Sequence, residues 1–342
     1  VVIDRPITVR SVNGPSNTVI QGAGPSGDGA VRCVYVGTNA VLSGFTLTNG
    51  ATRTTGFEVL DQMGGGAWCD EYGILTNCTL TGNSAADTGG GAFGGTLINC
   101  TLSGNSAVNN GGGAFGGTFG GTLISCKLSE NIADSGGGAG HCTLINCTLT
   151  GNMANSGGGA DFSTLTNCAL SGNSAVVLGG GAYGSTLNNC TLSGNTASNS
   201  GGGAYSSTLI CCILSGNLAV SLGGGAADGT LINCLLSGNS AGFGGGAEYS
   251  TMTNCTITGN MADFGGSTSE GTLNNCIVYF NSATVGNNYF GSECNYTCTT
   301  PDPGGTGNIT NDPQFVDADA SNYHLRADSP CIDRGTNLLT QG

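Results

Sequence analysis

Carboxylate side chains are the residues of this sequence best suited to acid–base chemistry. Five acids in the central part of the chain are expected to face outward: Asp70, Glu71, Asp161, Asp228 and Glu248. Cleavage of a glycosidic bond needs two or three carboxylates close together, and these five are separated by long stretches of chain. His141 is the nearest basic side chain to Asp161, but we expect this pair to be incidental. The sequence therefore favours a protein without a catalytic site.

A row of aromatic residues is the second candidate for chemistry. The residue that follows each Gly-Gly-Gly-Ala or similar segment is, in order, Trp68, Phe93, Phe115, Gly140, Asp161, Tyr183, Tyr205, Ala227 and Glu248. The five aromatic members, Trp68, Phe93, Phe115, Tyr183 and Tyr205, would form a stacking platform for sugar rings if they were exposed together. A ladder that only shields the glycine backbone is the alternative, and the sequence leaves both open.

Cysteine is the third residue type with possible chemistry. Ten of the 17 cysteines recur at a nearly constant spacing: Cys78, Cys100, Cys126, Cys147, Cys168, Cys190, Cys212, Cys234, Cys255 and Cys276. A linear stack lacks the tetrahedral clustering of a metal site, so we predict reduced packing residues, no metal and no cofactor. The other seven are Cys33, Cys69, Cys142, Cys211, Cys294, Cys298 and Cys331. One disulfide among the last three, near the C-terminus, remains an open alternative.

These residues must be positioned by a repeated unit. Thr186 to Ala197, Thr-Leu-Asn-Asn-Cys-Thr-Leu-Ser-Gly-Asn-Thr-Ala, is its clearest copy, and the cysteines recur every 21 or 22 residues with one step of 26. Such a period indicates a solenoid. Leu187, Cys190 and Leu192 alternate as inward positions, with one extra residue before the cysteine where the chain must turn. Two short strands and a glycine strand per repeat, without a helical period, predict an all-β fold: a right-handed, three-sided parallel β-helix.

Asparagine and glycine occupy the predicted corners. Asn tolerates left-handed backbone angles and precedes the cysteine in eight of ten copies. A second corner has an asparagine in every copy, forming a structural ladder of Asn83, Asn105, Asn131, Asn152, Asn173, Asn195, Asn217, Asn239, Asn260 and Asn281. The glycine triplets keep register with this pattern, which indicates tight corners rather than a disordered low-complexity segment.

Outward threonines form further rows. Thr stands four residues before the cysteine in nine copies, from Thr96 to Thr272, and Thr or Ser often follows the cysteine. A flat threonine array could bind ice, but Lys127, Ala169 and Ile213 interrupt the second row. β-Branched residues also favour strands for packing reasons.

Composition excludes some classes of partner. The formal net charge is −14, and between Arg53 and Arg326 the one cationic side chain, histidines aside, is Lys127. Nucleic-acid binding needs a basic surface, so no nucleic-acid partner is expected. No apolar run is long enough to span a membrane. Because the chain begins at Val1 rather than Met, we expect a processed form or a fragment.

The chain is predicted to have four parts. Residues 1–50 supply the first β-helix turns, 51–63 an insertion loop, 64–290 the regular repeats, and 291–342 a loop and C-terminal cap. A smaller insertion, Thr118 to Gly121, accounts for the 26-residue step. A cap is needed because an open β-helix end exposes unpaired backbone.

The repeat Thr-Leu-x-Asn-Cys-Thr-Leu-Ser-Gly-Asn-Ser-Ala, followed by Gly-Gly-Gly-Ala, resembles the right-handed β-helix repeats of the pectin-lyase-like superfamily and of polymorphic outer-membrane proteins. The end, with Asp-Pro-Gln-Phe-Val-Asp and Ser-Pro-Cys-Ile-Asp-Arg-Gly, is similar to the segment before the sorting region of choice-of-anchor Q proteins. The resemblance implies a β-helix but no single function, because such folds include lyases, hydrolases, adhesins and structural rods.

We therefore predict an extracellular or bacterial surface-exposed structural or adhesive rod, and we expect such a rod to be able to self-assemble into fibres. A protein that binds or degrades polysaccharide, with a glycan as its partner, is the first alternative. Ice binding through the threonine rows is the second.

Overall fold

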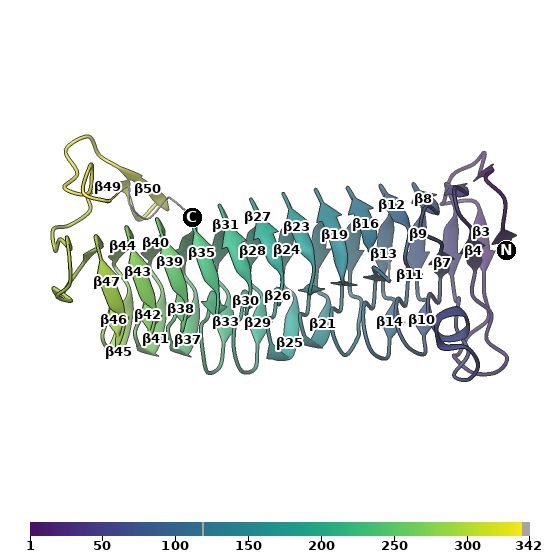
Figure 1. The fold of residues 1–342 in the computed structure, drawn as a ribbon, viewed down its shortest axis with the longest axis horizontal. Coiled ribbons are helices and arrows are strands. Elements are labelled where there is room, and N and C mark those ends of the chain that lie inside the picture. Colours follow the sequence, from purple (N-terminus) through teal and green to yellow (C-terminus); the bar gives the residue numbers. More distant parts are fainter. Residues whose placement is uncertain (118–119, 337–342) are drawn as a thin grey trace. The chain divides into compact units, whose positions relative to one another are not determined.

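The computed structural model describes residues 1–117 and 120–336, and the chain divides into two compact units, Val1–Thr191 and Leu192–Gly342. Each unit is a right-handed parallel β-helix in which every turn contributes one strand to each of three parallel sheets, here called sheets A, B and C (Figure 1). The predicted fold class is confirmed. A short fourth sheet, sheet D, was not predicted.

The strands of the first unit follow one another in chain order within each sheet. Sheet A contains β1 (Val2–Ile3), β4 (Val34–Val36), β7 (Ala67–Cys69), β11 (Ala92–Phe93), β15 (Ala114–Phe115), β18 (Ala139–Gly140), β22 (Ala160–Asp161) and β26 (Ala182–Tyr183). Sheet B contains β2 (Thr8–Arg10), β5 (Val41–Ser43), β8 (Ile74–Thr76), β12 (Thr96–Ile98), β16 (Gly121–Ile124), β19 (Cys142–Ile145), β23 (Thr164–Thr166) and β27 (Thr186–Asn188). Sheet C contains β3 (Val19–Gln21), β6 (Thr46–Thr48), β9 (Thr79–Thr81), β13 (Thr101–Ser103), β17 (Lys127–Ser129), β20 (Thr148–Thr150) and β24 (Ala169–Ser171). Sheet D pairs β10 (Ser84–Ala85) with β14 (Ser106–Ala107), and β21 (Met153–Ser156) with β25 (Ser174–Leu178).

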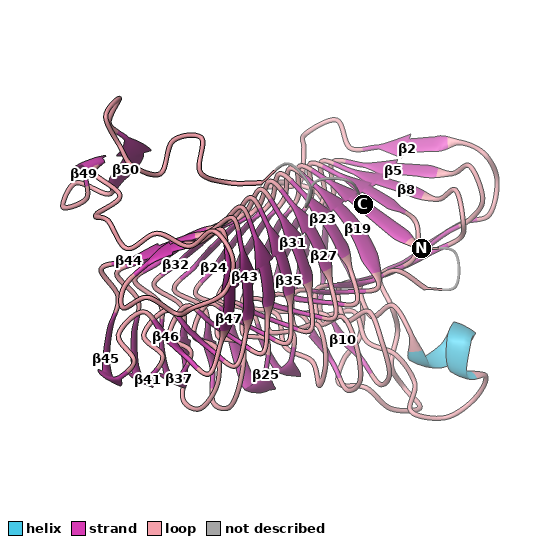
Figure 2. Ribbon diagram, turned by 60° about the vertical axis from the view of Figure 1, so that its left-hand side comes forward, coloured by secondary structure: helices cyan, strands magenta, loops and turns pink. Residues whose placement is uncertain are grey.

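The second unit repeats this order, and β28 (Thr191–Ser193) contains the chain boundary between the units. Sheet A contains β30 (Ala204–Tyr205), β34 (Ala226–Ala227), β38 (Ala247–Glu248), β42 (Thr268–Ser269) and β46 (Tyr289–Phe290). Sheet B contains β31 (Thr208–Ile210), β35 (Thr230–Ile232), β39 (Thr251–Thr253), β43 (Thr272–Asn274) and β47 (Glu293–Asn295). Sheet C contains β32 (Ile213–Ser215), β36 (Leu235–Ser237), β40 (Thr256–Thr258), β44 (Ile277–Tyr279) and β48 (Cys298–Thr299). Sheet D contains β29 (Thr196–Ala197), β33 (Leu218–Ala219), β37 (Ser240–Phe243), β41 (Met261–Phe264) and β45 (Ser282–Val285), seen edge-on in Figure 2.

The corners are where the repeat pattern places them. The residue before each ladder cysteine has a left-handed φ, for example 52° at Asn189, and Ser125 and Cys211 adopt the same angle where asparagine is missing. The position therefore imposes the geometry, and asparagine is the residue that adopts it at least cost. At the second corner glycine takes the left-handed angle, as at Gly172 with φ of 61°. The asparagine that follows it points inward and is buried.

Buried asparagines form a continuous hydrogen-bonded ladder within each unit. Asn152 is typical: its Oδ1 accepts from the backbone N–H of Asn131 at 3.1 Å and from Asn131 Nδ2 at 2.9 Å, while its Nδ2 donates to Leu128 O at 3.0 Å. Asn152 Nδ2 also donates to the next asparagine of the ladder, at 2.9 Å. Each amide thus satisfies backbone groups that the corner would otherwise leave unpaired in the core.

All ten ladder cysteines are buried and in the thiol form. The Cys190 thiol donates to Asn188 O at 3.3 Å and accepts from the Cys168 N–H at 3.4 Å, so the row contributes hydrogen bonds as well as packing. In the last turn Thr297 replaces the cysteine, and its hydroxyl makes the corresponding bonds to the Cys276 N–H and Leu273 O. A hydroxyl is therefore compatible with this row.

The glycine strands allow neighbouring turns to approach closely. A Cβ at Gly138 would lie 2.5 Å from Gly159 O, whereas a Cβ at Gly172 would meet no atom within 4 Å. The triplet glycines, which precede the strands of sheet A, are thus required by space, and the glycines of the asparagine corner by backbone angle.

Residues 51–63 form a loop with one helical turn, η1 (Glu58–Gln62), shown in cyan in Figure 2. Arg32 holds this loop by donating from its guanidinium to Leu60 O at 2.6 Å and to Met63 O at 2.7 Å. The second predicted insertion includes residues 118 and 119, which lie outside the described residues.

The C-terminal boundary differs from the expected one, because β47 and β48 lie beyond residue 290, where the sequence predicts a loop. The free edge of this last turn is covered by the following chain: Thr299 N–H donates to Ile309 O at 2.9 Å, and Ile309 N–H donates to Thr297 O at 3.1 Å. The next segment contains the antiparallel hairpin of β49 (Phe315–Asp317) and β50 (Asn322–Leu325), yellow in Figure 1. Residues 337–342 of the predicted cap lie outside the described residues.

Candidate functional site

Carboxylates gather on three consecutive turns of sheet A in the second unit. Ala227, Glu248 and Ser269 are register partners on β34, β38 and β42. The residue after each of these strands has a left-handed φ of 47° to 53° and points outward at the corner. These corner residues are Asp228, Tyr249 and Glu270. We call Asp228, Glu248 and Glu270 the carboxylate row.

Glu248 is the buried member of the carboxylate row. Its side chain is 2% exposed, and its Oε2 has no hydrogen-bond partner among the described residues. The pKa of Glu248 is raised from 4.5 to about 7. Burial is the main cause, the Ser269 hydroxyl opposes it, and the charges of Glu270 and Asp228 add smaller increases. A carboxyl group with such a pKa can hold and release a proton near neutral pH.

The flanks of the carboxylate row are exposed. Asp228 and Glu270 are exposed, and the Tyr249 ring, between them in the corner row, is 55% exposed. Of the three carboxylates, Glu270 is missing from the outward acids identified in the sequence. The segment Gly265-Gly266-Ser267-Thr268-Ser269 departs there from the usual Gly-Gly-Gly-Ala and is the signal that marks this turn.

The predicted His141–Asp161 arrangement in the first unit is not an ion pair. Their contact is through the backbone, where His141 N–H donates to Asp161 O at 2.9 Å. Asp161 is buried, its Oδ1 has no partner among the described residues, and burial raises its pKa to about 7. The His141 ring lies 5.5 Å from the Phe162 ring instead. Asp161 therefore has a displaced pKa but no second carboxylate or cation beside it in the described part of this unit.

The aromatic residues of the first unit form a longer stack than the predicted row. The centroids of consecutive rings lie 5.1 to 6.0 Å apart through Tyr35, Trp68, Phe93, Phe115, His141, Phe162 and Tyr183. In the turns whose row residues are Gly140 and Asp161, the following residue supplies the ring. We call these seven rings the ring stack.

The rings of the stack differ in how far they are exposed. Trp68 and Phe93 are buried, and Trp68 Nε1 donates to Val59 O of the 51–63 loop at 2.9 Å. Phe115 and Tyr183 are half-buried, whereas Phe162 is 53% exposed. The accessible part of the predicted platform is therefore shorter than the sequence suggests. Tyr205, on β30 of the second unit, is half-buried.

Several rings also cover glycine backbone. A Cβ at Gly117 would lie 3.0 Å from the Phe93 ring, and one at Gly184 would lie 2.7 Å from the Phe162 ring. These contacts match the second interpretation of the row, in which the rings shield glycines. Shielding and ligand binding are compatible for Phe162, because about half of its surface stays accessible.

The threonine rows of sheet B pair in register, as in Thr143 with Thr164, but their exposure varies from turn to turn. Thr96 and Thr122 are half-buried, whereas Thr186 is exposed. In sheet C of the first unit Lys127 and Ala169 interrupt the corresponding row. The surface is thus uneven in both chemistry and exposure.

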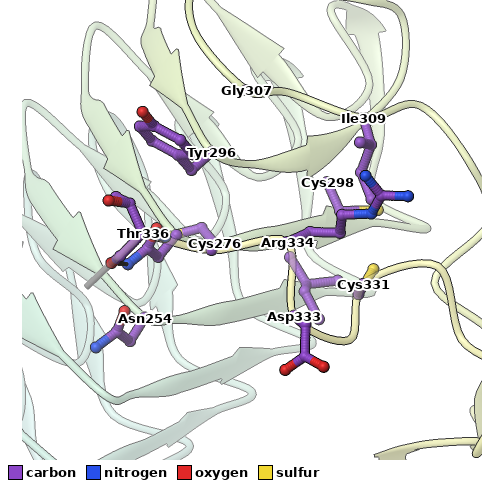
Figure 3. A pocket seen from close by; sticks show the side chains of 13 residues that line it. Asn254, Cys276, Tyr296, Cys298, Gly307, Ile309, Cys331, Asp333, Arg334 and Thr336 are labelled. Atoms are coloured by element: carbon purple, nitrogen blue, oxygen red, sulfur yellow. Dashed lines mark hydrogen bonds between the residues drawn. The ribbon is translucent and has the colours of Figure 1, made fainter. Parts of the chain in front are cut away.

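A cavity of about 520 Å³ lies in the second unit between sheet C and the C-terminal segment (Figure 3). Asn254, Tyr296, Cys298, Cys331 and Arg334 are among the residues that line it. Among residues 1–117 and 120–336, no group of three or more His, Cys, Asp or Glu side chains is arranged to hold a metal ion. In the same residues, no helix is long and apolar enough to cross a membrane.

Comparisons with known proteins give similarity in structure only. No family model and no curated protein matches the sequence. The Dettilon tailspike protein gp208 is 12% identical with a TM-score of 0.43, and the match covers 85% of this chain and 59% of the tailspike. The A-module of the Azotobacter vinelandii mannuronan C-5 epimerase AlgE4 is 11% identical (TM-score 0.36, covering 91% and 85%). Pectate lyase Pel9A is 15% identical (TM-score 0.33, covering 98% and 82%).

Proposed function

We propose that the chain acts on a polysaccharide at the carboxylate row, with Glu248 as the group that donates a proton to a glycosidic oxygen. The observation that carries this proposal is the state of Glu248, a buried carboxyl group with a free Oε2 and exposed carboxylates on the turns either side. A protonated acid beside a second carboxylate is the minimal arrangement for acid-assisted glycoside hydrolysis.

The geometry favours hydrolysis. Consecutive turns of a parallel β-helix are about 4.8 Å apart, so Asp228 and Glu270 each belong to a turn next to that of Glu248. One of them can stabilise the positive charge that develops on the sugar or direct a water molecule, while Glu248 protonates the leaving oxygen. Tyr249 provides an exposed ring against which a sugar can stack.

Charge favours an uncharged polysaccharide as the substrate. The sequence contains no Lys or Arg between Leu192 and Arg326, and the formal net charge of the chain is −14. A polyanionic glycan would meet the like charges of Asp228 and Glu270 without a cation on the same face. We therefore propose a neutral glycan, acted on by an extracellular or surface-exposed protein.

Release of reducing ends from a panel of neutral glucans, mannans, xylans and galactans tests the proposal. We expect turnover on at least one of them, lost on Glu248→Gln and retained in Asp263→Asn, which removes an exposed acid from sheet D of the same unit. Binding without turnover would refute the acid role of Glu248 and leave a glycan-binding protein. If the chain shows no binding and no turnover on any of these glycans, the result favours the structural or adhesive rod predicted from the sequence.

A second candidate function is glycan binding at the Phe162 ring of the ring stack, which the exposure of Phe162 favours. Affinity electrophoresis on the same glycans tests it. We expect Phe162→Ala to weaken retention, while Tyr72→Ala, which removes an exposed ring outside the stack, leaves it unchanged. Equal retention of both variants and the parent chain would exclude the ring stack as a binding surface.

A further inference from the structure

The C-terminal segment, residues 312–336, is attached to the β-helix of the second unit by contacts near both of its ends. Asn275 Nδ2 donates to Thr336 O at 2.8 Å and Asn275 Oδ1 accepts from Thr336 N–H at 2.9 Å. The Phe315 ring contacts the Phe280 ring, with a centroid distance of 6.2 Å. The 520 Å³ cavity is lined on one side by this segment, including Cys331 and Arg334, and on the other by the last turns, including Cys298 (Figure 3).

Two thiols meet at the wall of this cavity. Cys298 lies on β48 and is buried, whereas Cys331 comes from the segment and is half-buried. Both side chains line the cavity, and Figure 3 shows the two residues at the same side of it. The two thiols therefore lie close together, one on the last turn of the β-helix and the other on the C-terminal segment.

The ladder cysteines differ from this pair in accessibility. All ten are buried, and the thiols of Cys147 and Cys234 donate to backbone carbonyl oxygens and accept from backbone N–H groups in the core. The Cys298 thiol likewise donates to a backbone oxygen, that of Asn311, at 3.2 Å. Cys294, on the strand next to Cys298, is in register with Leu273 and is buried. The Cys298–Cys331 pair therefore combines two adjacent sulfurs with access from solvent through Cys331.

We propose that Cys298 and Cys331 form a disulfide that joins the C-terminal segment to the last turn of the β-helix. The interaction with Cys298 lowers the pKa of Cys331, and the same interaction raises the pKa of Cys298. Cys331 is consequently the better nucleophile and the more accessible sulfur.

The reaction needs a two-electron oxidant, and a small-molecule disulfide such as oxidised glutathione supplies it. The Cys331 thiolate attacks one sulfur of the reagent, breaking its S–S bond and releasing one thiolate. The Cys298 sulfur, after losing its proton to solvent, then attacks Cys331 and displaces the second thiolate. Two protein thiols are oxidised, one reagent disulfide is reduced to two thiols, and the chain loses two hydrogen atoms.

The test incubates the full chain with oxidised glutathione, blocks remaining thiols with an alkylating reagent and maps the peptides by mass spectrometry. We expect one peptide pair linked through Cys298 and Cys331, absent in Cys331→Ser and present in Cys211→Ser, which removes an exposed thiol of the same unit. Cleavage of the segment by a protease should be slower in the oxidised parent chain than in the reduced chain, and equally fast in oxidised and reduced Cys331→Ser.

Two results would overturn the proposal. Alkylation of both Cys298 and Cys331 after oxidation would show that the bridge does not form. A bridge from Cys298 to Cys294 would show that the segment is not the partner. Because Cys331 is only half-buried, its replacement by serine leaves the β-helix core intact, so loss of the linked peptide cannot be ascribed to unfolding.

Discussion

Replacement of Glu248 by glutamine should change how the stability of the second unit depends on pH. The folded state raises the pKa of Glu248 from 4.5 to about 7. In the native chain the carboxyl group stays protonated up to about pH 7, whereas in the unfolded chain it ionises near its ordinary pKa. Unfolding therefore releases a proton between these values, and stability falls as the pH rises through this window.

The size of the effect follows from the shift. Each pKa unit corresponds to about 1.4 kcal/mol, so the full shift would amount to about 3 kcal/mol. Because the carboxylate row borders solvent, screening reduces this, and we expect about 1 to 2 kcal/mol. Glutamine stays neutral at every pH. Glu248→Gln should therefore match the parent chain near pH 5 and exceed its stability by that amount at pH 8.

Urea unfolding followed by far-UV circular dichroism at several pH values measures this difference. Fluorescence is unsuitable because the single tryptophan, Trp68, reports on the first unit. Asp161 contributes a pH dependence of its own, which cancels in the comparison of the two proteins. Parallel curves for Glu248→Gln and the parent chain between pH 5 and 8 would refute the raised pKa and, with it, the proposed proton donor.

Four further predictions concern the β-helix itself. Asn152→Ala should lower the free energy of unfolding by about 3 to 6 kcal/mol, since it leaves several buried backbone and amide groups without partners; a cost below about 1 kcal/mol in urea unfolding would contradict the role of the ladder. Gly138→Ala should cost about 3 kcal/mol from overpacking, against about 1 kcal/mol of backbone strain for Gly172→Ala, compared by thermal unfolding. Cys190→Ser should cost only about 1 kcal/mol in the same measurement, because a hydroxyl can use the hydrogen-bond partners of the thiol. Deletion of residues 300–342 should expose the last strand edge and produce end-to-end fibres in electron micrographs; short monodisperse rods would argue against edge pairing.

Much of the fold can be predicted from the repeat, because each position of the repeat requires one particular backbone angle or side-chain direction. The left-handed corner before the cysteine, the glycine at the second corner and the inward Asn are all local requirements, visible in a single copy such as residues 186–197. Because the unit repeats, identical residues of successive turns stack on one another and form the ladders. The C-terminal boundary was less predictable, because Thr297 replaces the ladder cysteine and hides one further turn.

The candidate sites depend on contacts that the repeat pattern does not contain. The covering of Trp68 comes from the 51–63 loop, whose position is set by Arg32 from an earlier turn. The ring stack continues through His141 and Phe162 because a ring one residue later in the chain can fill the same space. Neither relation could be predicted from the spacing of the row residues alone.

The carboxylate row shows how departures from a regular repeat can mark chemistry. In the turns of the ring stack, aromatic side chains cover the glycine backbone and fill the space beside it. On β34, β38 and β42 the row instead carries Ala227, Glu248 and Ser269, so no ring covers Glu248 from the same row. A β-helix under selection for packing alone would place an apolar side chain where Glu248 lies, because an unpaired buried carboxyl group costs stability at neutral pH. That cost is intelligible if the carboxyl group holds a proton for a reaction, since the same burial that destabilises the ionised form keeps the proton available near pH 7.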